Sequence, residues 1–196
     1  MNRPLVGVPV KSFGVAKERL SGHLTATQRR KLGQGLAART VKTISAAGIR
    51  VVVIAADQAV EDWAHHEGFD VLRQVRTGLN GASRDLVDAA DGPWGIVFAD
   101  LPLLTTDDVI AVIEAMQGRP VISPSRDGGT NAMLGVGHRF DFAYGPGSFH
   151  RHMVRLARDH PIVTVRTGLA LDLDTPDDLF HARRNSPWLN DLLTAT

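Results

Sequence analysis

The chain has 196 residues, of which 43% are hydrophobic and 22% charged, and this ordinary globular composition predicts a single domain over residues 1–196. Its 22 basic and 21 acidic residues give a net charge of +1, which provides no overall field to attract nucleic acid or a membrane surface. The absence of cysteine excludes disulfides, thiolate metal sites and cysteine nucleophiles, and the absence of a membrane-length apolar run or a signal-peptide pattern favours a cytoplasmic protein.

Apolar runs rich in β-branched residues alternate with amphipathic segments along the chain. In chain order the pattern predicts strand 5–10, helix 25–47, strand 50–56, helix 59–67, strand 94–99, helix 105–116, strand 119–123, helix 148–158, strand 161–165 and helix 175–184. Strands that alternate with helices favour an α/β fold whose largely parallel sheet is covered on both faces. The tail, residues 185–196, is expected to form either a docked segment or a dimer element.

A dinucleotide-binding pattern in the first predicted helix is interpreted as a decoy. Gly33, Gly35 and Ala38 match G-x-G-x-x-A, but that motif requires a strand directly before it. The preceding residues instead begin a helix, in which Thr25 and Gln28 form a candidate capping box. We therefore expect these small residues to let the helix approach the sheet closely, and we do not expect a nicotinamide cofactor.

Open α/β sheets bind ligands at the carboxyl ends of their strands, and four segments place unusual chemistry there. The first is the loop over residues 10–20, which carries cations at Lys11, Lys17 and Arg19. Such a loop suits a triphosphate, because arginine offers a bidentate fork and lysine a point charge. The alternative is a solvated basic loop.

The second segment is the sequence FADLP, in which an apolar strand ends at Asp100. The following proline places Asp100 at the rim of the sheet, where a hard oxygen ligand suits Mg²⁺. Alone, this pattern is equally typical of an aspartate that begins a turn.

The third segment, residues 171–179, contains two alternating carboxylates. On a strand, Asp172 and Asp174 would share one face and would repel each other unless a cation or a proton lay between them. The competing interpretation makes Asp174 or Thr175 the N-cap of a helix with Pro176 at its first position. Both interpretations hold together if Thr175 caps the helix while the carboxylates face a cleft.

The fourth segment is a pair of glycine-rich stretches, residues 127–131 and 144–149. Glycines let backbone N–H groups approach an anion, and the second stretch leads into a predicted helix whose N-terminus favours negative charge. Ser148 is expected either to cap that helix or to bind a phosphate or carboxylate. The eight histidines, including His150 and His152, are expected to have surface or packing roles, and no zinc site is expected.

In combination and order, these segments resemble the guanylyltransferases of coenzyme F420 biosynthesis, which activate 2-phospholactate or a related phosphorylated three-carbon acid with GTP. The resemblance spans residues 10–184 and is carried by Lys11, AKERL (16–20), GLN (78–80), DLP (100–102), GGTNA (128–132), residues 142–149 and residues 172–179. It implies a Rossmann-like nucleotidyltransferase fold of the GT-A-like type, a three-layer α/β/α sandwich with a mostly parallel central sheet.

The resemblance also implies roles for individual residues, with Mg²⁺ as the cofactor and GTP as the co-substrate. The metal would be held by Asp100, Asp172 and Asp174, of which Asp174 is the firmer of the last two. Lys11, Lys17 and Arg19 would bind the nucleotide phosphates, and together with Asp100 they would be the catalytic residues. Leu79 and Asn80 would lie near the base or ribose. The phosphorylated acid would be bound by Thr130, Asn131, Gly145, Gly147 and Ser148.

The resemblance leaves the acid open among phosphoenolpyruvate, 2-phospho-L-lactate and 3-phospho-D-glycerate. It implies a homodimer that passes its product to the downstream F420 transferase, without nucleic-acid or membrane partners. One rival is a sugar-1-phosphate or molybdenum-cofactor nucleotidyltransferase, although the first loop carries only Gly14 where many such enzymes are glycine-rich. The rival of another class is an inactive nucleotide-binding regulatory domain.

Overall fold

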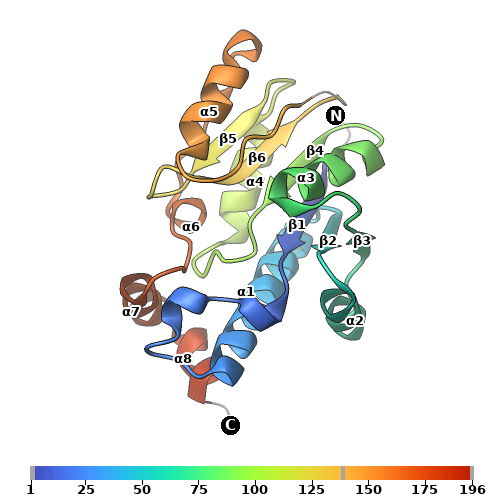
Figure 1. Ribbon diagram of the computed structural model, residues 1–196. Helices are drawn as coiled ribbons and strands as arrows, with labels where there is room; N and C mark the ends of the chain where they lie inside the picture. Colours follow the sequence, from blue (N-terminus) through green and yellow to red (C-terminus); the bar gives the residue numbers. More distant parts are fainter. Residues whose placement is uncertain (1–2, 138–139, 195–196) are drawn as a thin grey trace.

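A computed structural model describes residues 3–137 and 140–194, and Figure 1 shows their arrangement. Its sheet has seven strands in the order β3-β2-β1-β4-β6-β5-β7. The strands are β1 (Leu5–Val10), β2 (Val51–Ala55), β3 (Val71–Arg73), β4 (Trp94–Val97), β5 (Val121–Pro124), β6 (Thr130–Gly135) and β7 (Ile162–Val163). The helices are α1 (Ala26–Ala46), α2 (Gln58–His66), α3 (Gly78–Ala89), α4 (Thr106–Ala115), α5 (Ser148–Arg155), α6 (Thr167–Ala170), α7 (Pro176–Asn185) and α8 (Pro187–Thr194), with 3₁₀ turns η1 (Phe13–Val15), η2 (Glu18–Leu20) and η3 (Ala157–Asp159).

The sheet is mostly parallel, as predicted. Strands β3, β2, β1 and β4 run in parallel, as do β5 and β7, whereas β6 is antiparallel to both of its neighbours, β4 and β5. Strands β3 and β6 and helix α3 were not among the predicted elements. The β6 sequence TNAMLG is fully buried, so it does not alternate between apolar and polar residues, and a glycine-rich turn precedes it.

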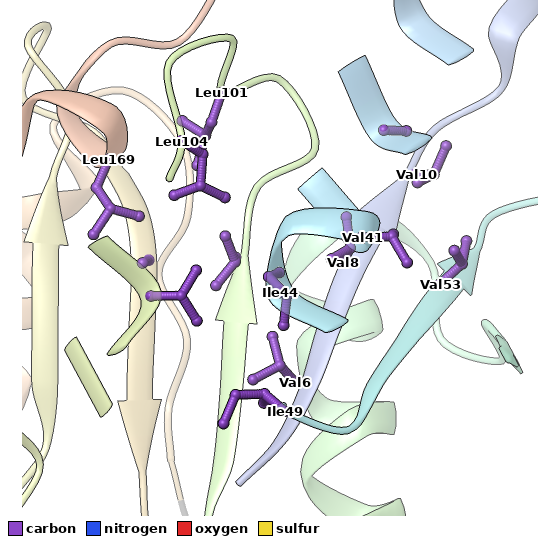
Figure 2. Close-up of a cluster of buried hydrophobic side chains, with 14 of the residues drawn as sticks. Val6, Val8, Val10, Val41, Ile44, Ile49, Val53, Leu101, Leu104 and Leu169 are labelled. Carbon is purple, nitrogen blue, oxygen red and sulfur yellow. The ribbon is translucent and has the colours of Figure 1, made fainter. Parts of the chain in front are cut away.

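Helices cover both faces of the sheet, so the predicted three-layer α/β/α architecture is confirmed. On one face, Val6, Val8 and Val10 of β1 pack with the buried residues of α1, α2 and α4 in a single cluster, part of which Figure 2 shows. On the other face, α3 and α5 lie over β4, β5 and β6 in a second cluster. The chain is tightly packed at Gly7, because an added Cβ would lie 2.7 Å from the end of the Ile54 side chain and 2.8 Å from that of Leu86, and both would have to shift.

The first helix begins as predicted, with a capping box in which the Thr25 hydroxyl accepts from the backbone N–H of Gln28 and Oε1 of Gln28 accepts from the backbone N–H of Thr25. The expected purpose of its two glycines, a close approach to the sheet, was wrong: an added Cβ on Gly33 would lie 3.2 Å from Ala16, in the loop after β1. A Cβ on Gly35 would lie 2.5 Å from Leu192, so the close neighbour there is α8 and not the sheet. The predicted tail thus docks: α8 packs on α1 and α7 around the fully buried Leu189.

The predicted strand around Asp172 was also wrong. Residues 171–174 have no regular secondary structure and link α6 to α7. The segment is nevertheless fixed, because the Leu173 N–H donates to the Asp100 carbonyl over 3.0 Å and the Leu173 side chain is fully buried. Within residues 3–137 and 140–194, no helix is long and apolar enough to cross a membrane.

Candidate active site

A cavity of about 720 Å³ opens at the carboxyl ends of the parallel strands. Its walls come from the segments after β1, β2, β3 and β4, from the start of α3 and from the link before α7. The predicted site residues among its lining are Lys11, Lys17, Arg19, Leu79, Asp100, Asp172 and Asp174. The structure therefore brings together residues that lie up to 163 positions apart, as Asp174 and Lys11 do.

A larger hollow of about 1090 Å³ lies against the opposite side of α1, between α2 and α8. Trp63 and Trp188 contribute to its lining, and none of the predicted site residues does. The predicted site residues meet in the smaller cavity, so that cavity is the candidate active site.

Lys17 is the central cation of this cavity. Its Nζ lies 2.8 Å from Oδ2 of Asp100 and 2.8 Å from Oδ1 of Asp174, and its side chain is only 9% exposed. Burial opposes the charge of the ammonium, but the two carboxylates outweigh burial and raise the pKa of Lys17 above its ordinary value. Lys17 also has a left-handed backbone, with φ 54° and ψ 40°, a conformation that costs a residue other than glycine about 1 kcal/mol. Its ion pairs hold it there.

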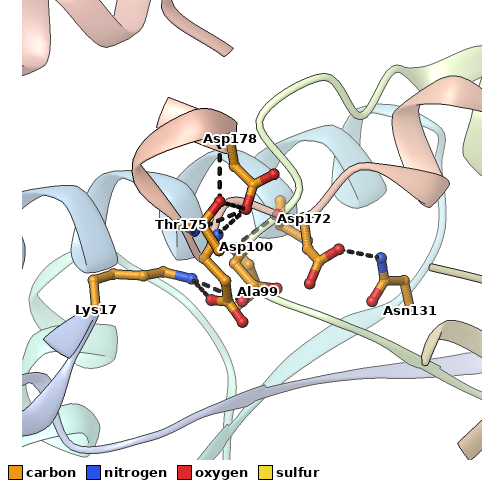
Figure 3. Close-up of polar contacts among 9 residues, drawn as sticks. Lys17, Ala99, Asp100, Asn131, Asp172, Thr175 and Asp178 are labelled. Carbon is orange, nitrogen blue, oxygen red and sulfur yellow. Dashed lines mark hydrogen bonds and ion pairs between the residues drawn. The ribbon is translucent and has the colours of Figure 1, made fainter. Parts of the chain in front are cut away.

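Asp172 is turned to the other side of the cluster (Figure 3). Its Oδ1 accepts a hydrogen bond of 3.3 Å from Nδ2 of Asn131, which also donates to the carbonyl of Leu169. Burial and the negative charge of Asp100 raise the pKa of Asp172 to about 6, against a smaller lowering by the Asn131 bond. Asp172 thus carries a carboxylate whose ionisation the surrounding protein opposes.

The link that carries Asp172 and Asp174 is anchored at both ends. On one side, the Leu173–Asp100 backbone bond joins it to the segment after β4, where the hydroxyl of Thr40 also donates to the carbonyl of Ala99. On the other side, Thr175 and Asp178 form a capping box at the start of α7. The sequence hypothesis that combined a Thr175 cap with carboxylates in a cleft is therefore correct.

The carboxylates partly fit a divalent cation. Oδ1 of Asp100 is buried and has no hydrogen-bond partner among the described residues, and Asp100, Asp172 and Asp174 all line this cavity. As they lie, however, the described part of the chain contains no three His, Cys, Asp or Glu side chains grouped closely enough to hold a metal ion. Lys17 occupies the space between two of the predicted ligands, so metal ligation stays a prediction that requires this ion pair to open.

The residues predicted to bind the acid form a separate group beside the cavity. Thr130 begins β6 and Ser148 begins α5, and both side chains are nearly fully buried. The Ser148 hydroxyl donates to Oγ1 of Thr130 over 3.3 Å. Gly145 and Gly147 lie exposed in the preceding turn, and Gly147, not Ser148, is the N-cap of α5. Asn131 connects this group to the cavity through Asp172.

Asn80 also differs in position from its neighbour Leu79. Leu79 lines the cavity, whereas Oδ1 of Asn80 accepts a 2.8 Å hydrogen bond from the backbone N–H of Tyr144. Asn80 thereby joins α3 to the turn that precedes α5.

The sequence predicted a surface or packing role for His152, and the structure bears out the packing alternative, with polar contacts that the sequence did not predict. His152 is fully buried and contacts Thr130 and the backbone of Ala143. The available signal was weak: His150 and His152 lie two apart in a helix, so only one of them faces the sheet, and the pattern does not say which.

Comparisons with known proteins identify the family of the chain. A family model described as guanylyl transferase, CofC like, matches residues 5–182. The chain is 38% identical over 183 residues to a phosphoenolpyruvate guanylyltransferase of Rubrobacter xylanophilus, covering 88% of this chain and 89% of the relative. It is 35% identical to the phosphoenolpyruvate guanylyltransferase of Sphaerobacter thermophilus, covering 92% of each, and 31% identical to the 2-phospho-L-lactate guanylyltransferase of Methanopyrus kandleri, covering 89% of this chain and 88% of the relative.

Solved structures with low sequence identity share the fold. A protein described as a nucleotide-diphospho-sugar transferase from Desulfovibrio desulfuricans has a TM-score of 0.76 at 17% identity, covering 98% of this chain and 94% of that one. Glucosyl-3-phosphoglycerate synthase from Mycobacterium tuberculosis, solved with Mn²⁺ and uridine diphosphate, has a TM-score of 0.61 at 14% identity, covering 96% and 79%. The extensive family match and the relatives above 30% identity confirm the resemblance inferred from the sequence: the chain belongs to the CofC-like guanylyltransferase family.

Proposed function

We propose that this protein transfers the guanylyl group of GTP to the phosphate of a small phosphorylated acid, with phosphoenolpyruvate as the preferred acid. The observation that carries the proposal is the convergence of Lys17, Asp100, Asp172 and Asp174 on one cavity. Phosphoenolpyruvate is favoured over 2-phospho-L-lactate because the relatives named for it are 35% and 38% identical, against 31% for the Methanopyrus kandleri relative.

The cations of the β1 loop suit the triphosphate. Lys11, Lys17 and Arg19 line the cavity on one side, and Leu79 at the start of α3 lines it on another. An arginine fork and two ammonium groups would neutralise the departing pyrophosphate. Oδ1 of Asn80 accepts a hydrogen bond from the Tyr144 N–H, so Asn80 would contact the ribose while it holds this bond.

The carboxylates of Asp100, Asp172 and Asp174 would hold Mg²⁺, whose chemistry is to neutralise charge on the phosphate groups. The unpartnered Oδ1 of Asp100 and the raised pKa of Asp172 support this role. A cation would give the oxygen a partner and would favour the ionised form of Asp172. The Mn²⁺ in the glucosyl-3-phosphoglycerate synthase gives a precedent for a divalent ion in this fold. For the ion to take Asp174 as a ligand, Lys17 would exchange its carboxylate for a phosphate oxygen.

The acid would lie beside the carboxylates, near the turn at Gly145–Gly147. A phosphate oxygen of the acid attacks the α-phosphorus of GTP, the bond to the β-phosphate oxygen breaks, and pyrophosphate leaves. The acid's phosphate is already a competent nucleophile, so neither a covalent intermediate nor a strong base is required. The tasks left to the protein are alignment and charge neutralisation.

The test uses the full chain with GTP, Mg²⁺ and each of the three acids, with and without a deazaflavin precursor and its downstream transferase. Pyrophosphate release should depend on the acid and should be fastest with phosphoenolpyruvate. Turnover with a sugar 1-phosphate alone would support the sugar nucleotidyltransferase alternative. GTP binding without turnover on any acceptor would support the regulatory-domain alternative.

The cellular setting follows from the same proposal. GTP and phosphoenolpyruvate are made in the cytoplasm, so the protein would act there and pass its product to the downstream F420 transferase. The homodimer expected from the resemblance is tested by light scattering coupled to gel filtration.

A further inference from the structure

His152 lies at the centre of a buried hydrogen-bond network that the proposed chemistry does not use directly. Its side chain is fully buried, with Nδ1 3.0 Å from Oγ1 of Thr130 and Nε2 2.9 Å from the backbone nitrogen of Ala143. The ring therefore joins the start of β6 to the segment that precedes α5. The His152 and Tyr144 rings pack in a T-shaped arrangement, with ring centroids 4.9 Å apart.

The two contacts determine which ring nitrogen carries the proton. The backbone N–H of Ala143 can only donate, so Nε2 must accept and must be unprotonated. A neutral ring then carries its hydrogen on Nδ1 and donates it to Thr130. A second proton, on Nε2, would point at the Ala143 N–H, so the geometry opposes the charged ring. Burial and the charges of Arg155 and Arg151 agree with this, because they lower the pKa of His152 to about 4.

Thr130 passes the constraint on to α5. Its Oγ1 accepts from Nδ1 of His152 and from the hydroxyl of Ser148, so both acceptor positions of that oxygen are used. The start of β6 and the first residue of α5 are thus fixed to each other through one imidazole and two hydroxyl groups, none of which is charged.

The segment before α5 is held on its other side by arginines of the same helix. Arg151 donates to the Ala143 carbonyl over 2.9 Å, while His152 accepts from the N–H of Ala143, so both polar groups of this residue are fixed. Arg155 donates to the carbonyl of Phe142 over 3.0 Å. The exposed glycine turn at residues 145–147 follows directly, so its starting point is rigid.

We propose that His152 is a positioning residue for the phosphorylated acid: as a neutral donor to Thr130 and acceptor from Ala143, it holds the glycine turn in the conformation that receives the acid's phosphate. The inference rests on the proposed function, which places the acid at this turn. His152 does not touch the reacting atoms; it acts through Ala143, Thr130 and Ser148. The nucleotide side of the cavity is built on the β1 loop and α3, and α3 meets this segment through Asn80, which accepts from the N–H of Tyr144, and not through the His152 ring.

The test compares His152→Phe, which keeps a ring of similar size without either hydrogen bond, with His152→Gln, whose amide oxygen can still accept from Ala143. His152→Phe should raise the KM for phosphoenolpyruvate about tenfold or more, as expected for leaving the buried Ala143 N–H without an acceptor and Oγ1 of Thr130 without a donor, while the KM for GTP changes less than about twofold. His152→Gln should recover most of this loss. His150→Phe, on the exposed face of the same helix, is the matched control and should leave both KM values unchanged.

A second measurement is independent of turnover. In a ¹⁵N-labelled protein at pH 7, the His152 ring, assigned by its absence from the spectrum of His152→Phe, should carry its proton on Nδ1 alone. A ring protonated on Nε2 would overturn the inference. So would an unchanged acid KM in a folded His152→Phe variant, or equal losses for acid and GTP. If the unmutated protein neither binds nor turns over any of the three acids, the proposed function itself fails, and the subsite assignment fails with it.

Discussion

The two halves of the candidate site are held together by different forces. The nucleotide half is built on charge: Lys17 bridges Asp100 and Asp174, whose side chains are 24% and 44% exposed. The acid half is built on neutral hydrogen bonds among His152, Thr130 and Ser148, of which none is more than 2% exposed. One half is therefore ionic with partly exposed carboxylates, and the other is a buried network of neutral side chains, with Arg151 and Arg155 bound to the carbonyls beside it.

This difference has a consequence for how each half responds to ligands. Lys17 is nearly buried, but Asp100 and Asp174 are partly exposed, so an arriving phosphate or metal ion can reach the pair and take the place of one of its charged partners. A buried hydrogen bond has no such replacement, because breaking it leaves a donor without water. We therefore expect the charged half to rearrange on binding and the neutral half to be formed in advance.

The largest effect is expected for Asp100→Asn, which breaks the charged half. The amide keeps the size of the carboxylate but removes its charge, and turnover should fall about a thousandfold because metal-dependent charge stabilisation is lost. The melting temperature should change little. Rates of pyrophosphate release and thermal denaturation measure the two quantities, and full retained activity would refute the assignment of Asp100.

Lys17→Met separates the metal role of the carboxylates from their ion pair. Turnover should fall about a hundredfold with the loss of a phosphate cation. Without Mg²⁺ the variant should lose about 1–3 kcal/mol of stability, since Asp100 and Asp174 are left without a counter-charge. Mg²⁺ should restore part of this loss, and so should raise the melting temperature more in the variant than in the unmutated chain.

The control for that experiment is Lys11→Met, in the same loop but exposed and outside the Asp100–Asp174 cluster. It should leave the Mg²⁺-dependent shift unchanged. Equal shifts in all three proteins would mean that Lys17 and the metal do not compete for the same carboxylates.

The neutral half is tested by its response to acid. The folded pKa of His152, about 4, lies below the ordinary value of 6.5, so the unfolded chain gains a proton first as the pH falls and stability is lost between pH 6.5 and pH 4. Between pH 7 and pH 4.5 this group alone should lower the free energy of unfolding by about 2 kcal/mol. Urea unfolding at both pH values should show a smaller decrease in the free energy of unfolding for His152→Phe than for the unmutated chain. Equal decreases in the two proteins would contradict the buried neutral ring.

The sequence predicted the parts of the molecule that depend on local pattern. Alternation of apolar strands with helices predicted the mostly parallel sheet, and the Thr25–Gln28 and Thr175 caps are where the pattern placed them. These features are determined by residues within a few positions of one another, so their signal lies in a short window. The sequence also predicted that Asp100 lies near Asp172 and Asp174, but only through the expectation that they share one metal ion.

The contacts that were not predicted depend on distant residues. β6 does not alternate because the sheet and helices bury both of its faces. The Leu173–Asp100 backbone bond fixes residues 172–174 although they form no strand. The Lys17 ion pairs span 83 and 157 positions, and the His152–Thr130 contact spans 22. No periodicity encodes such pairings, so they require the folded chain.

The smallest predicted effect distinguishes function from stability within the charged half. Asp172 is a partly buried carboxylate beside Asp100, and its raised pKa of about 6 means that ionisation opposes folding at neutral pH. Asp172→Asn keeps an acceptor for Asn131 and removes the repulsion, so it should stabilise the metal-free protein by about 1 kcal/mol after allowance for solvent screening, while it lowers turnover. Asp91→Asn, an exposed carboxylate before β4, should change stability by less than about 0.5 kcal/mol. A destabilised Asp172→Asn would mean that Asn131 and the neighbouring charges favour the ionised carboxylate. The ionic half would then not be strained without its ligands, and its contrast with the relaxed neutral half would no longer hold.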